Sequence, residues 1–329
     1  MIGRISRHLS VGGLASVAAV VLGVLSAPAA GQVELRQEPI RPIPLNHDED
    51  QGKVDLGRRL FADKRLSTAG DFSCTQCHDF SLAGIDGRAR ARFREKEGER
   101  NVPTIFNTRY NVAQVWDGRF LDVEADIEAT VASPHSFASH WPSVVDRLRG
   151  VPEYAEVFSN LYREGLTKKT VIDAVAVYLR ALTTPNSRFD RYLRGDEGAI
   201  GAEEKEGYAL FKSYGCIACH QGAAVGGNMF QRFGVLGDYF ADKAGEAVPD
   251  LGRYNVTGHP DDRFAFKVPS LRLVVRTAPY LHDGSVATLE EAIRIMAKYQ
   301  LGRAIPAEHI HLIVRFLESL VGEHGGKPL

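Results

Sequence analysis

The pentapeptide Cys-x-x-Cys-His occurs twice in this sequence, at residues 74–78 and 216–220. In c-type haem proteins, the two cysteines of such a motif form thioethers with the haem vinyl groups, and the histidine becomes an axial ligand of the iron. The two motifs use all four cysteines of the chain. The repeat therefore predicts two covalently attached haems, held by Cys74, Cys77 and His78 and by Cys216, Cys219 and His220.

Two other uses of paired cysteines compete with this interpretation. A single Cys-x-x-Cys is often a redox dithiol, and two such pairs can form a four-cysteine zinc site. Zinc-ribbon pairs usually lie closer together in sequence than Cys74 and Cys216. Neither alternative explains why a histidine directly follows both pairs, so two haems are the favoured prediction.

Length and composition place the chain among ordinary globular proteins. Its 329 residues allow two domains, and its hydrophobic content of 44% and charged content of 25% are average. The formal net charge is -1. Nucleic-acid binding would require a basic excess, which this sequence does not have.

The N-terminus has the pattern of a secretory signal peptide. Basic residues at Arg4 and Arg7 precede an apolar run from Leu9 to Leu25, and small residues follow at 27–30. We expect residues 1–30 to be removed, with an uncleaved anchor as the alternative. No later stretch is apolar enough to span a membrane, so the mature protein is predicted to be periplasmic.

An internal repeat supports a division into two haem domains. A helical segment with Gly57-Arg58-Arg59-Leu60-Phe61 precedes the first motif, and Gly207-Tyr208-Ala209-Leu210-Phe211 precedes the second. The predicted fold class is mostly α, with two tandem cytochrome-c-like domains at residues 31–198 and 199–329, joined near residues 195–201. Predicted helices cover residues 53–63, 123–131, 144–148, 170–182, 288–299 and 307–321. The helix at 170–182 opens with Thr170 and Asp173 in capping-box-like spacing, and Thr288 with Glu291 forms a capping box for the helix at 288–299.

Residues 86–100 are dense in charge, with Arg88, Arg90, Arg92 and Arg94 at alternate positions and Arg100 at the end. Such a run is most often a solvated loop. A docking surface for a partner is the alternative interpretation.

The second axial position of each iron decides between an electron carrier and a site that binds peroxide. Apart from Met1, the methionines are Met229 and Met296. Met229 follows His220 closely, in a glycine-rich loop. Met296 lies on an apolar helical stripe, where a core methionine and a haem ligand are both consistent with the pattern.

Over residues 56–321 the sequence resembles the bacterial dihaem cytochrome c peroxidases, including the methylamine-utilisation branch that matures a tryptophan-derived cofactor. The resemblance rests on segments around both haem motifs, at residues 56–61, 100–104, 116–119, 266–272, 277–284 and 296–302. It implies a peroxide-reducing N-terminal haem and a C-terminal haem that receives electrons from a small cytochrome or copper protein. It also implies an inter-domain calcium ion and, in many relatives, a homodimer.

The resemblance assigns roles to individual residues. Met296 matches the methionine ligand of the electron-entry haem, where the cofactor-maturing enzyme has a tyrosine; His282, in a neighbouring motif, is its main rival. Trp116 matches a tryptophan between the haems that is a plausible electron relay, although a buried core indole would look the same. Asn101, with the backbone carbonyls of Thr277 and Pro279, matches the calcium site.

Two departures from the family pattern affect the peroxidatic haem. Many members carry a capping histidine shortly after the first motif, but here no histidine occurs between His78 and His135. We therefore expect the first haem to be five-coordinate at rest. The family's distal glutamine and glutamate fall on Asp126 and Ser136.

Peroxide cleavage needs a distal group that moves a proton between the two oxygens. Serine is poorly suited to this task, so Asp126 and His135 are the candidate catalytic residues, with Glu124 and Glu128 as further possibilities. His135 could instead be a distal haem ligand or an ordinary surface histidine.

The predicted function is reduction of hydrogen peroxide to water by a dihaem peroxidase. Two alternatives are a dihaem enzyme that oxidatively modifies a partner protein, and a dihaem electron carrier or redox sensor without turnover. Met296 argues against the first, and the missing distal glutamate favours the second.

Overall fold

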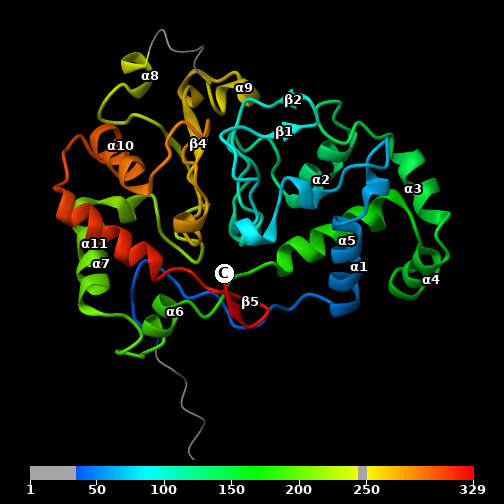
Figure 1. The fold of residues 1–329 in the computed structure, drawn as a ribbon, viewed down its shortest axis with the longest axis horizontal. Helices are drawn as coiled ribbons and strands as arrows, with labels where there is room; N and C mark the ends of the chain where they lie inside the picture. Colours follow the sequence, from blue (N-terminus) through cyan, green and yellow to red (C-terminus); the bar gives the residue numbers. More distant parts are fainter. Residues whose placement is uncertain (1–34, 244–249) are drawn as a thin grey trace, which may run out of the picture. The chain divides into compact units, whose positions relative to one another are not determined.

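Helices and short loops make up most of the computed structural model, which describes residues 35–243 and 250–329. The predicted signal peptide, residues 1–30, lies outside the described residues. The α-helices are α1 Gln51–Phe61, α2 Val123–Ala132, α3 Trp141–Arg149, α4 Pro152–Leu161, α5 Lys168–Ala181, α6 Arg188–Leu193, α7 Ala202–Tyr214, α8 Tyr239–Asp242, α9 Tyr254–Thr257, α10 Leu289–Leu301 and α11 Ala307–Glu318. The prediction of a mostly helical fold is confirmed (Figure 1).

The strands in the described part of the chain are two or three residues long and pair antiparallel as β1 with β2, β3 with β4 and β5 with β6. They are β1 Arg92–Phe93, β2 Lys96–Glu97, β3 Phe230–Arg232, β4 Ala265–Lys267, β5 Glu323–His324 and β6 Lys327–Pro328. None of the described helices is long and apolar enough to cross a membrane.

Two helix pairs each cross closely at a glycine. Helix α1 packs against α5, and α7 packs against α11 (Figure 1). A Cβ atom added at Gly57 would lie 2.0 Å from the Ala174 carbonyl oxygen, and one added at Gly207 would lie 1.9 Å from the Leu312 carbonyl oxygen. Only glycine allows such close helix approach. The repeated glycine of the sequence therefore marks the crossing point in each pair.

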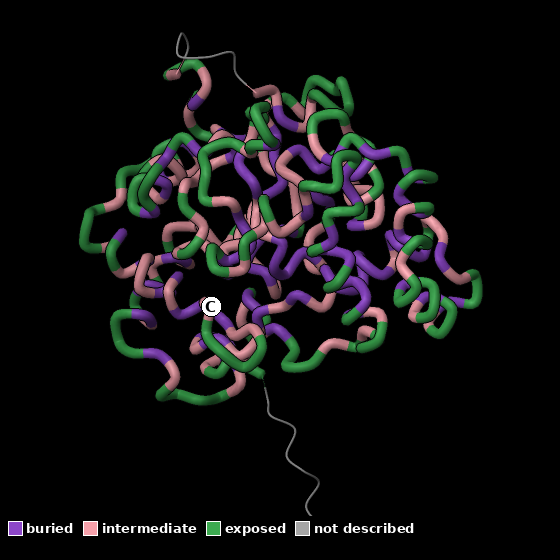
Figure 2. Tube along the Cα trace, turned by 45° about the vertical axis from the view of Figure 1, so that its right-hand side comes forward, coloured by how far each residue is buried: buried purple, intermediate pink, exposed green. Residues whose placement is uncertain are grey.

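The buried side chains form separate hydrophobic clusters. Figure 2 shows that buried stretches of the chain concentrate in the interior and exposed stretches at the periphery. One cluster is built mainly from α1–α5, and includes Leu60, Phe158 and Val175. Another is built mainly from α6, α7 and α11, and it also takes up Ile40 from the extended N-terminal arm. Residues 35–329 group as one compact unit, and the boundary between residues 198 and 199 stays a prediction.

Several helix boundaries differ from those predicted. Helix α5 begins three residues earlier than a cap at Thr170 would allow, because Thr167 is the N-cap and its hydroxyl accepts from the Thr170 backbone N–H. Helices α4, α6, α8 and α9 were not predicted. The last three have only six, four and four residues, too few for a clear periodic pattern, whereas α4 has ten. The cap predicted at Thr288 is confirmed, because its hydroxyl accepts from the Glu291 N–H.

Candidate functional site

The first Cys-x-x-Cys-His motif forms a 3₁₀ turn at Cys74–Gln76 that brings its histidine back toward its first cysteine. The His78 backbone N–H donates to the Cys74 carbonyl over 3.0 Å. The imidazole Nδ1 lies 3.0 Å from the Gly84 carbonyl, which accepts a hydrogen bond from it. Burial lowers the pKa of His78, so the ring is neutral. With Nδ1–H held by Gly84, Nε2 keeps the lone pair that a metal requires.

The second motif repeats the backbone turn, although no residue that the structure describes hydrogen-bonds His220 Nδ1 as Gly84 does that of His78. Its turn is Cys216–Ala218, and the His220 backbone N–H donates to the Cys216 carbonyl over 3.0 Å. Gly215 ends α7 in the left-handed conformation (φ 97°) and turns the chain into the motif. Burial lowers the pKa of His220 to about 4, against a smaller opposing effect of the nearby backbone. This imidazole is therefore also neutral and suited to bind a metal.

The internal repeat places an aromatic ring beside each motif histidine. The Phe61 ring centroid lies 6.3 Å from that of His78, and the Phe211 ring centroid lies 6.4 Å from that of His220. Both phenylalanines stand four residues after the glycine of their helix crossing. The repeat noticed in the sequence thus places a phenylalanine ring beside each histidine.

The thiols of Cys74, Cys77 and Cys216 differ from those of a redox dithiol. None of the four cysteines forms a disulfide. Burial raises the pKa of Cys74 to about 12 and those of Cys77 and Cys216 to about 11, whereas redox dithiols need lowered pKa values. Within residues 35–243 and 250–329, no three His, Cys, Asp or Glu side chains are placed to share a metal ion. This placement disfavours the four-cysteine zinc site.

Each motif thus pairs two thiols with a neutral, partly buried imidazole, which is the donor set of a c-type haem. The residues present fit the predicted group. Cys74, Cys77 and His78 would hold one haem, and Cys216, Cys219 and His220 the other.

Trp116 connects the segments that lie between the two motifs. Its indole N–H donates to the Asn101 carbonyl over 3.0 Å, and its own carbonyl accepts from the Lys267 N–H over 2.8 Å. The Asn101 N–H in turn donates to the His282 carbonyl over 2.8 Å. Trp116 is partly buried and packs against the aromatic cluster of Phe233, Tyr239, Phe266 and Tyr299.

A buried ion-pair network holds the turn that follows Trp116. The Asp117 carboxylate is fully buried and lies 2.5 Å from both the Arg100 and the Arg119 guanidinium groups. Arg100 also forms a bidentate pair with Asp250, over 2.6 and 2.9 Å. Burial raises the pKa of Asp117, but the two guanidinium groups outweigh it and hold the pKa below its usual range.

The prediction of a solvated loop over residues 86–100 needs one correction. The arginines at 88, 90, 92 and 94 are exposed as predicted. Arg100 is only 13% exposed, because it reaches inward to Asp117 and Asp250. Its position at the end of a charge run concealed this role in the sequence.

Helix α2 carries the acidic candidates for the distal side of the first haem. The Glu124 carboxylate pairs with Arg180, and that of Glu128 pairs with Lys168. Asp126 has no such partner among the described cations, and only the Thr130 hydroxyl donates to it, over 3.3 Å. Burial raises the pKa of Asp126 to about 6, and the charge of Asp126 contributes to the raised pKa of Cys74. Asp126 therefore lies close to the first motif.

The loop after α2 carries the other two candidates. His135 is exposed, and its backbone N–H donates to the Ser133 hydroxyl. The Ser136 hydroxyl donates to the Thr130 carbonyl, so its proton is not available to a molecule bound at the haem. Neither residue shows the desolvated, unpaired character of Asp126.

Met296 and its rival His282 both lie at the aromatic cluster that also contacts Trp116. Met296, on α10, is partly buried against the cluster. The His282 ring is buried, with its centroid 4.3 Å from that of Phe266, and burial lowers its pKa. Met229, in the loop before β3, is outside this cluster as described.

The residues matched to a calcium site lie on two segments that are hydrogen-bonded to each other. Asn101 is buried, and its side-chain amide donates to the Arg88 carbonyl over 2.8 Å. Its backbone bond to His282 places it beside the segment that contains Thr277 and Pro279. The Asn101 side-chain oxygen is free to bind a cation or accept a hydrogen bond, since no described donor bonds to it.

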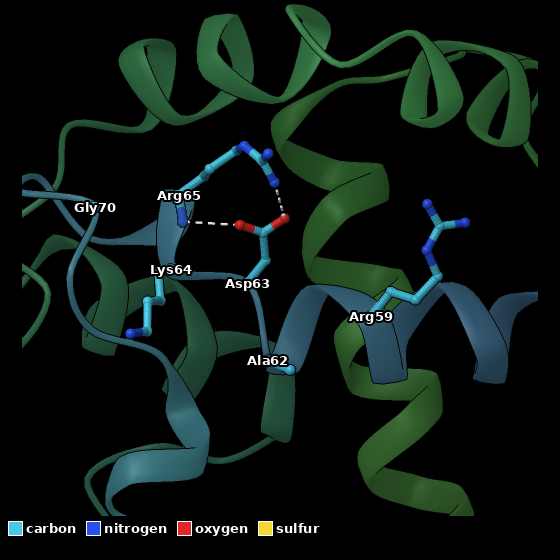
Figure 3. A pocket seen from close by; sticks show the side chains of 6 residues that line it. All are labelled: Arg59, Ala62, Asp63, Lys64, Arg65 and Gly70. Carbon is cyan, nitrogen blue, oxygen red and sulfur yellow. Dashed lines mark hydrogen bonds and ion pairs between the residues drawn. The ribbon is translucent and has the colours of Figure 1, made fainter.

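A surface pocket at the end of α1 lies apart from the predicted residues (Figure 3). It is lined by Arg59, Ala62, Asp63, Lys64, Arg65 and Gly70. Its carboxylate, that of Asp63, already accepts from the Arg65 backbone and side chain and from the Tyr154 hydroxyl. None of the predicted site residues lines it.

Known proteins share both the sequence and the fold of this chain. The family model described as "Di-haem cytochrome c peroxidase" matches residues 51–198. The cytochrome c551 peroxidase of Nitrosomonas europaea is 38% identical over 97% of this chain and 93% of its own length. The cytochrome c peroxidase Ccp of Escherichia coli is 40% identical over 88% of this chain, which spans only 62% of that protein.

Among solved structures, a MauG-like protein associated with microbial copper homeostasis has a TM-score of 0.74 and 27% identity, covering 89% of this chain and 95% of that one. On this similarity the chain belongs to the dihaem cytochrome c peroxidase family. Membership makes the chain an oxidoreductase and implies haem c as its cofactor.

Proposed function

We propose that this protein reduces hydrogen peroxide to water, using electrons from a small redox protein. When bound, the haem groups supply the iron site that takes peroxide and the redox equivalents for its reduction. The overall reaction consumes two electrons and two protons for each peroxide and forms two water molecules. The roles of the chain's own residues follow from their surroundings.

The observation that carries the proposal is the environment of Asp126. A carboxyl group with a pKa near 6 can take a proton from one peroxide oxygen and return it to the other at neutral pH. Glu124 and Glu128, on the same helix, are neutralised by cations. Because Asp126 lies close to Cys74, we assign the peroxide-reducing site to the first motif.

We further propose that the first iron is open to peroxide at rest. The chain has no histidine between His78 and His135, and the His135 side chain is exposed. His135 is then a surface residue, rather than a catalytic group or a distal haem ligand.

Electron entry is assigned to the second motif, with Met296 as the second axial ligand beside His220. The support is the packing of Met296 among aromatic side chains, where a thioether is well accommodated. Trp116 touches the same cluster and is bonded to Asn101, so we propose it as the relay between the two sites. A calcium ion at Asn101, Thr277 and Pro279 would fix this junction through oxygen ligands.

The partner and the compartment are also proposals. A relative named cytochrome c551 peroxidase supports a small c-type cytochrome as the electron donor, with a small copper protein as the alternative. The signal-like residues 1–30 support a periplasmic location for the mature protein.

A second candidate function is oxidative modification of a partner protein. The similarity to a solved MauG-like protein favours it. Met296 speaks against it, since the cofactor-maturing branch carries tyrosine at the matching position.

Peroxide-dependent oxidation of a reduced small cytochrome c, followed by absorbance, tests the proposal. We expect steady turnover by the protein with both haems attached. A protein with both haems but no turnover and no reaction with peroxide would be an electron carrier. Peroxide consumption that leaves the cytochrome reduced, but changes the mass of a co-purified protein, would favour the second candidate.

A further inference from the structure

Lys267 is a buried cation that the proposed function does not use. It is the last residue of β4, and only 6% of its surface is exposed. Across the described residues, no carboxylate lies within ion-pair distance of its ammonium group, and no hydrogen bond is formed by Nζ. Burying an unpaired charge is costly, so such a lysine either loses its proton or meets an anion that the polypeptide does not supply.

The β3–β4 pair places Lys267 between the second haem motif and the Trp116 turn. Lys267 stands directly opposite Phe230, so the two side chains share a face of the ladder. A Cβ atom added at Gly118 would lie 2.2 Å from the Phe230 ring, which places the turn after Trp116 on that face. The Lys267 backbone N–H bonds to the Trp116 carbonyl at the same place.

The chain beyond Lys267 leads directly to the surroundings of His220. The Val268 carbonyl accepts from the Gly227 N–H over 2.8 Å, and a Cβ atom at Gly226 would lie 2.2 Å from the Pro269 carbonyl and 3.3 Å from His220 Nδ1. On β3, Gln231 pairs with Phe266 and so points to the face of the ladder opposite Lys267, and its amide lies 4.0 Å from the Cys219 sulfur. The ladder that carries Lys267 thus lies along the second motif.

We propose that Lys267 supplies the cation that binds a propionate carboxylate of the haem at Cys216, Cys219 and His220. Haem propionates are carboxylates, and they arrive with the cofactor, which accounts for a buried ammonium group without a partner in the polypeptide. A hydrogen-bonded ammonium–carboxylate pair would offset the cost of burying Lys267. The proposal rests on haem attachment at the second motif but not on peroxide turnover.

The pair would also set the reduction potential of that haem. Positive charge beside a haem favours its reduced form, because reduction lowers the charge on the iron. Removing the charge by Lys267→Met should therefore make reduction of the second haem harder. We expect the equilibrium constant of reduction to fall by about tenfold, which is about 59 mV for a one-electron couple.

The test is a potentiometric titration of Lys267→Met, Lys267→Arg and the wild-type protein, each with both haems confirmed by the pyridine haemochrome assay. Lys169→Met is the matched control, since Lys169 is an exposed lysine on α5. The expected result is a lower potential for the second haem in Lys267→Met alone. A shift confined to the first haem would contradict the assignment to the second, and no shift of either potential would overturn the proposal.

Resonance Raman spectra keep the proposal testable if Lys267→Met does not retain haem. Lys267→Arg preserves the charge but changes the hydrogen-bond geometry, so the propionate bending band should move while the potential stays near that of the wild type. An unchanged band would overturn the proposal. Since neither readout uses peroxide, a failed peroxidase assay would not affect this result.

Discussion

The Arg100 guanidinium lies 2.5 Å from the fully buried carboxylate of Asp117 and also donates two hydrogen bonds to the Asp250 carboxylate. Arg100 directly precedes Asn101, whose carbonyl accepts from the Trp116 indole. A single cation therefore ties together the turn that carries the proposed relay and a loop more than a hundred residues away in sequence. This geometry makes Arg100 a positioning residue for Trp116.

We predict that Arg100→Gln destabilises the protein by about 2 kcal/mol. The loss should be smaller than the roughly 3–5 kcal/mol expected for a fully unpaired buried charge, because Arg119 still pairs with Asp117. Urea denaturation measures the difference. Arg92→Gln is the control, since its pair with Glu95 is exposed and should contribute less than about 0.5 kcal/mol.

The same variant has a predictable pH dependence. The pKa of Asp117 is lowered in the folded protein, so its ion pairs stabilise the fold above the ordinary carboxyl pKa of about 4 and lose this effect as pH falls through the lowered value. The stability difference between Arg100→Gln and wild type should shrink below about pH 4. If the stability difference between Arg100→Gln and wild type stayed constant down to the acid transition, the ion pair with Asp117 would not be the source of the stabilisation by Arg100.

Asp126→Asn should slow the reaction of the ferric protein with peroxide by about 10²- to 10⁴-fold, the usual contribution of a proton-transferring group. In the wild type, the rate of the peroxide reaction should rise as the pH increases through about 6. Above its raised pKa, Asp126 loses its proton, and its carboxylate can then accept one from peroxide. The variant should lack this rise. Stopped-flow absorbance across the pH range measures both effects.

Two matched variants separate Asp126 from its rivals. Glu128→Gln changes an exposed carboxylate on the same helix, and His135→Gln changes the exposed histidine of the next loop. Both should react with peroxide within about twofold of the wild-type rate, a difference of about 0.4 kcal/mol in barrier. A large loss in His135→Gln with full activity in Asp126→Asn would reverse the assignment.

Met296→His should lower the potential of the second haem, because methionine ligation raises the potential of a c-type haem. Potentiometric titration measures it. Met229→Leu serves as the control, since Met229 lies outside the aromatic cluster that receives Met296. If Met296→His left the potential unchanged, Met296 would not be the ligand, and His282 would be the next candidate.

Gly57→Ala and Gly207→Ala should each destabilise the fold by about 1–3 kcal/mol or more, since the new methyl group would meet a backbone carbonyl at about 2 Å. This cost exceeds the ~1 kcal/mol that alanine gains over glycine in a helix. Gly198→Ala should change stability by less than about 0.5 kcal/mol, since its backbone is not left-handed and the new methyl group would make only an ordinary contact, 3.6 Å from Asp196 Oδ1. Equal stability of all three variants, measured by urea denaturation, would mean that the helix crossings are not tight.

The sequence predicts the parts of this protein that depend on local pattern. The two haem motifs, the helix before each of them and the scarcity of strands all follow from short motifs and periodicity, and the structure confirms the helical fold. Short helices such as α6 are missed, because six residues carry too little periodic signal. The cap at Thr167 is missed because Thr170 offers the same chemistry one turn later.

Contacts between distant segments are what the sequence conceals. Arg100 looks like one more charge in a solvated run, and only the fold shows that it pairs with Asp117 and Asp250. Likewise, three acids on α2 look equivalent until Arg180 and Lys168 neutralise two of them and leave Asp126. Burial and pairing of this kind are set by residues far away in the chain, so no local pattern records them.

The most direct test of the account is stopped-flow absorbance of the protein mixed with hydrogen peroxide, starting from the fully ferric and from the half-reduced state. We predict a fast change in the haem spectrum of the ferric protein, because the chain places no histidine between His78 and His135 to cap the first iron. The change should be slow in Asp126→Asn. No fast change from either starting state, with both haems attached, would contradict peroxide reduction by this protein.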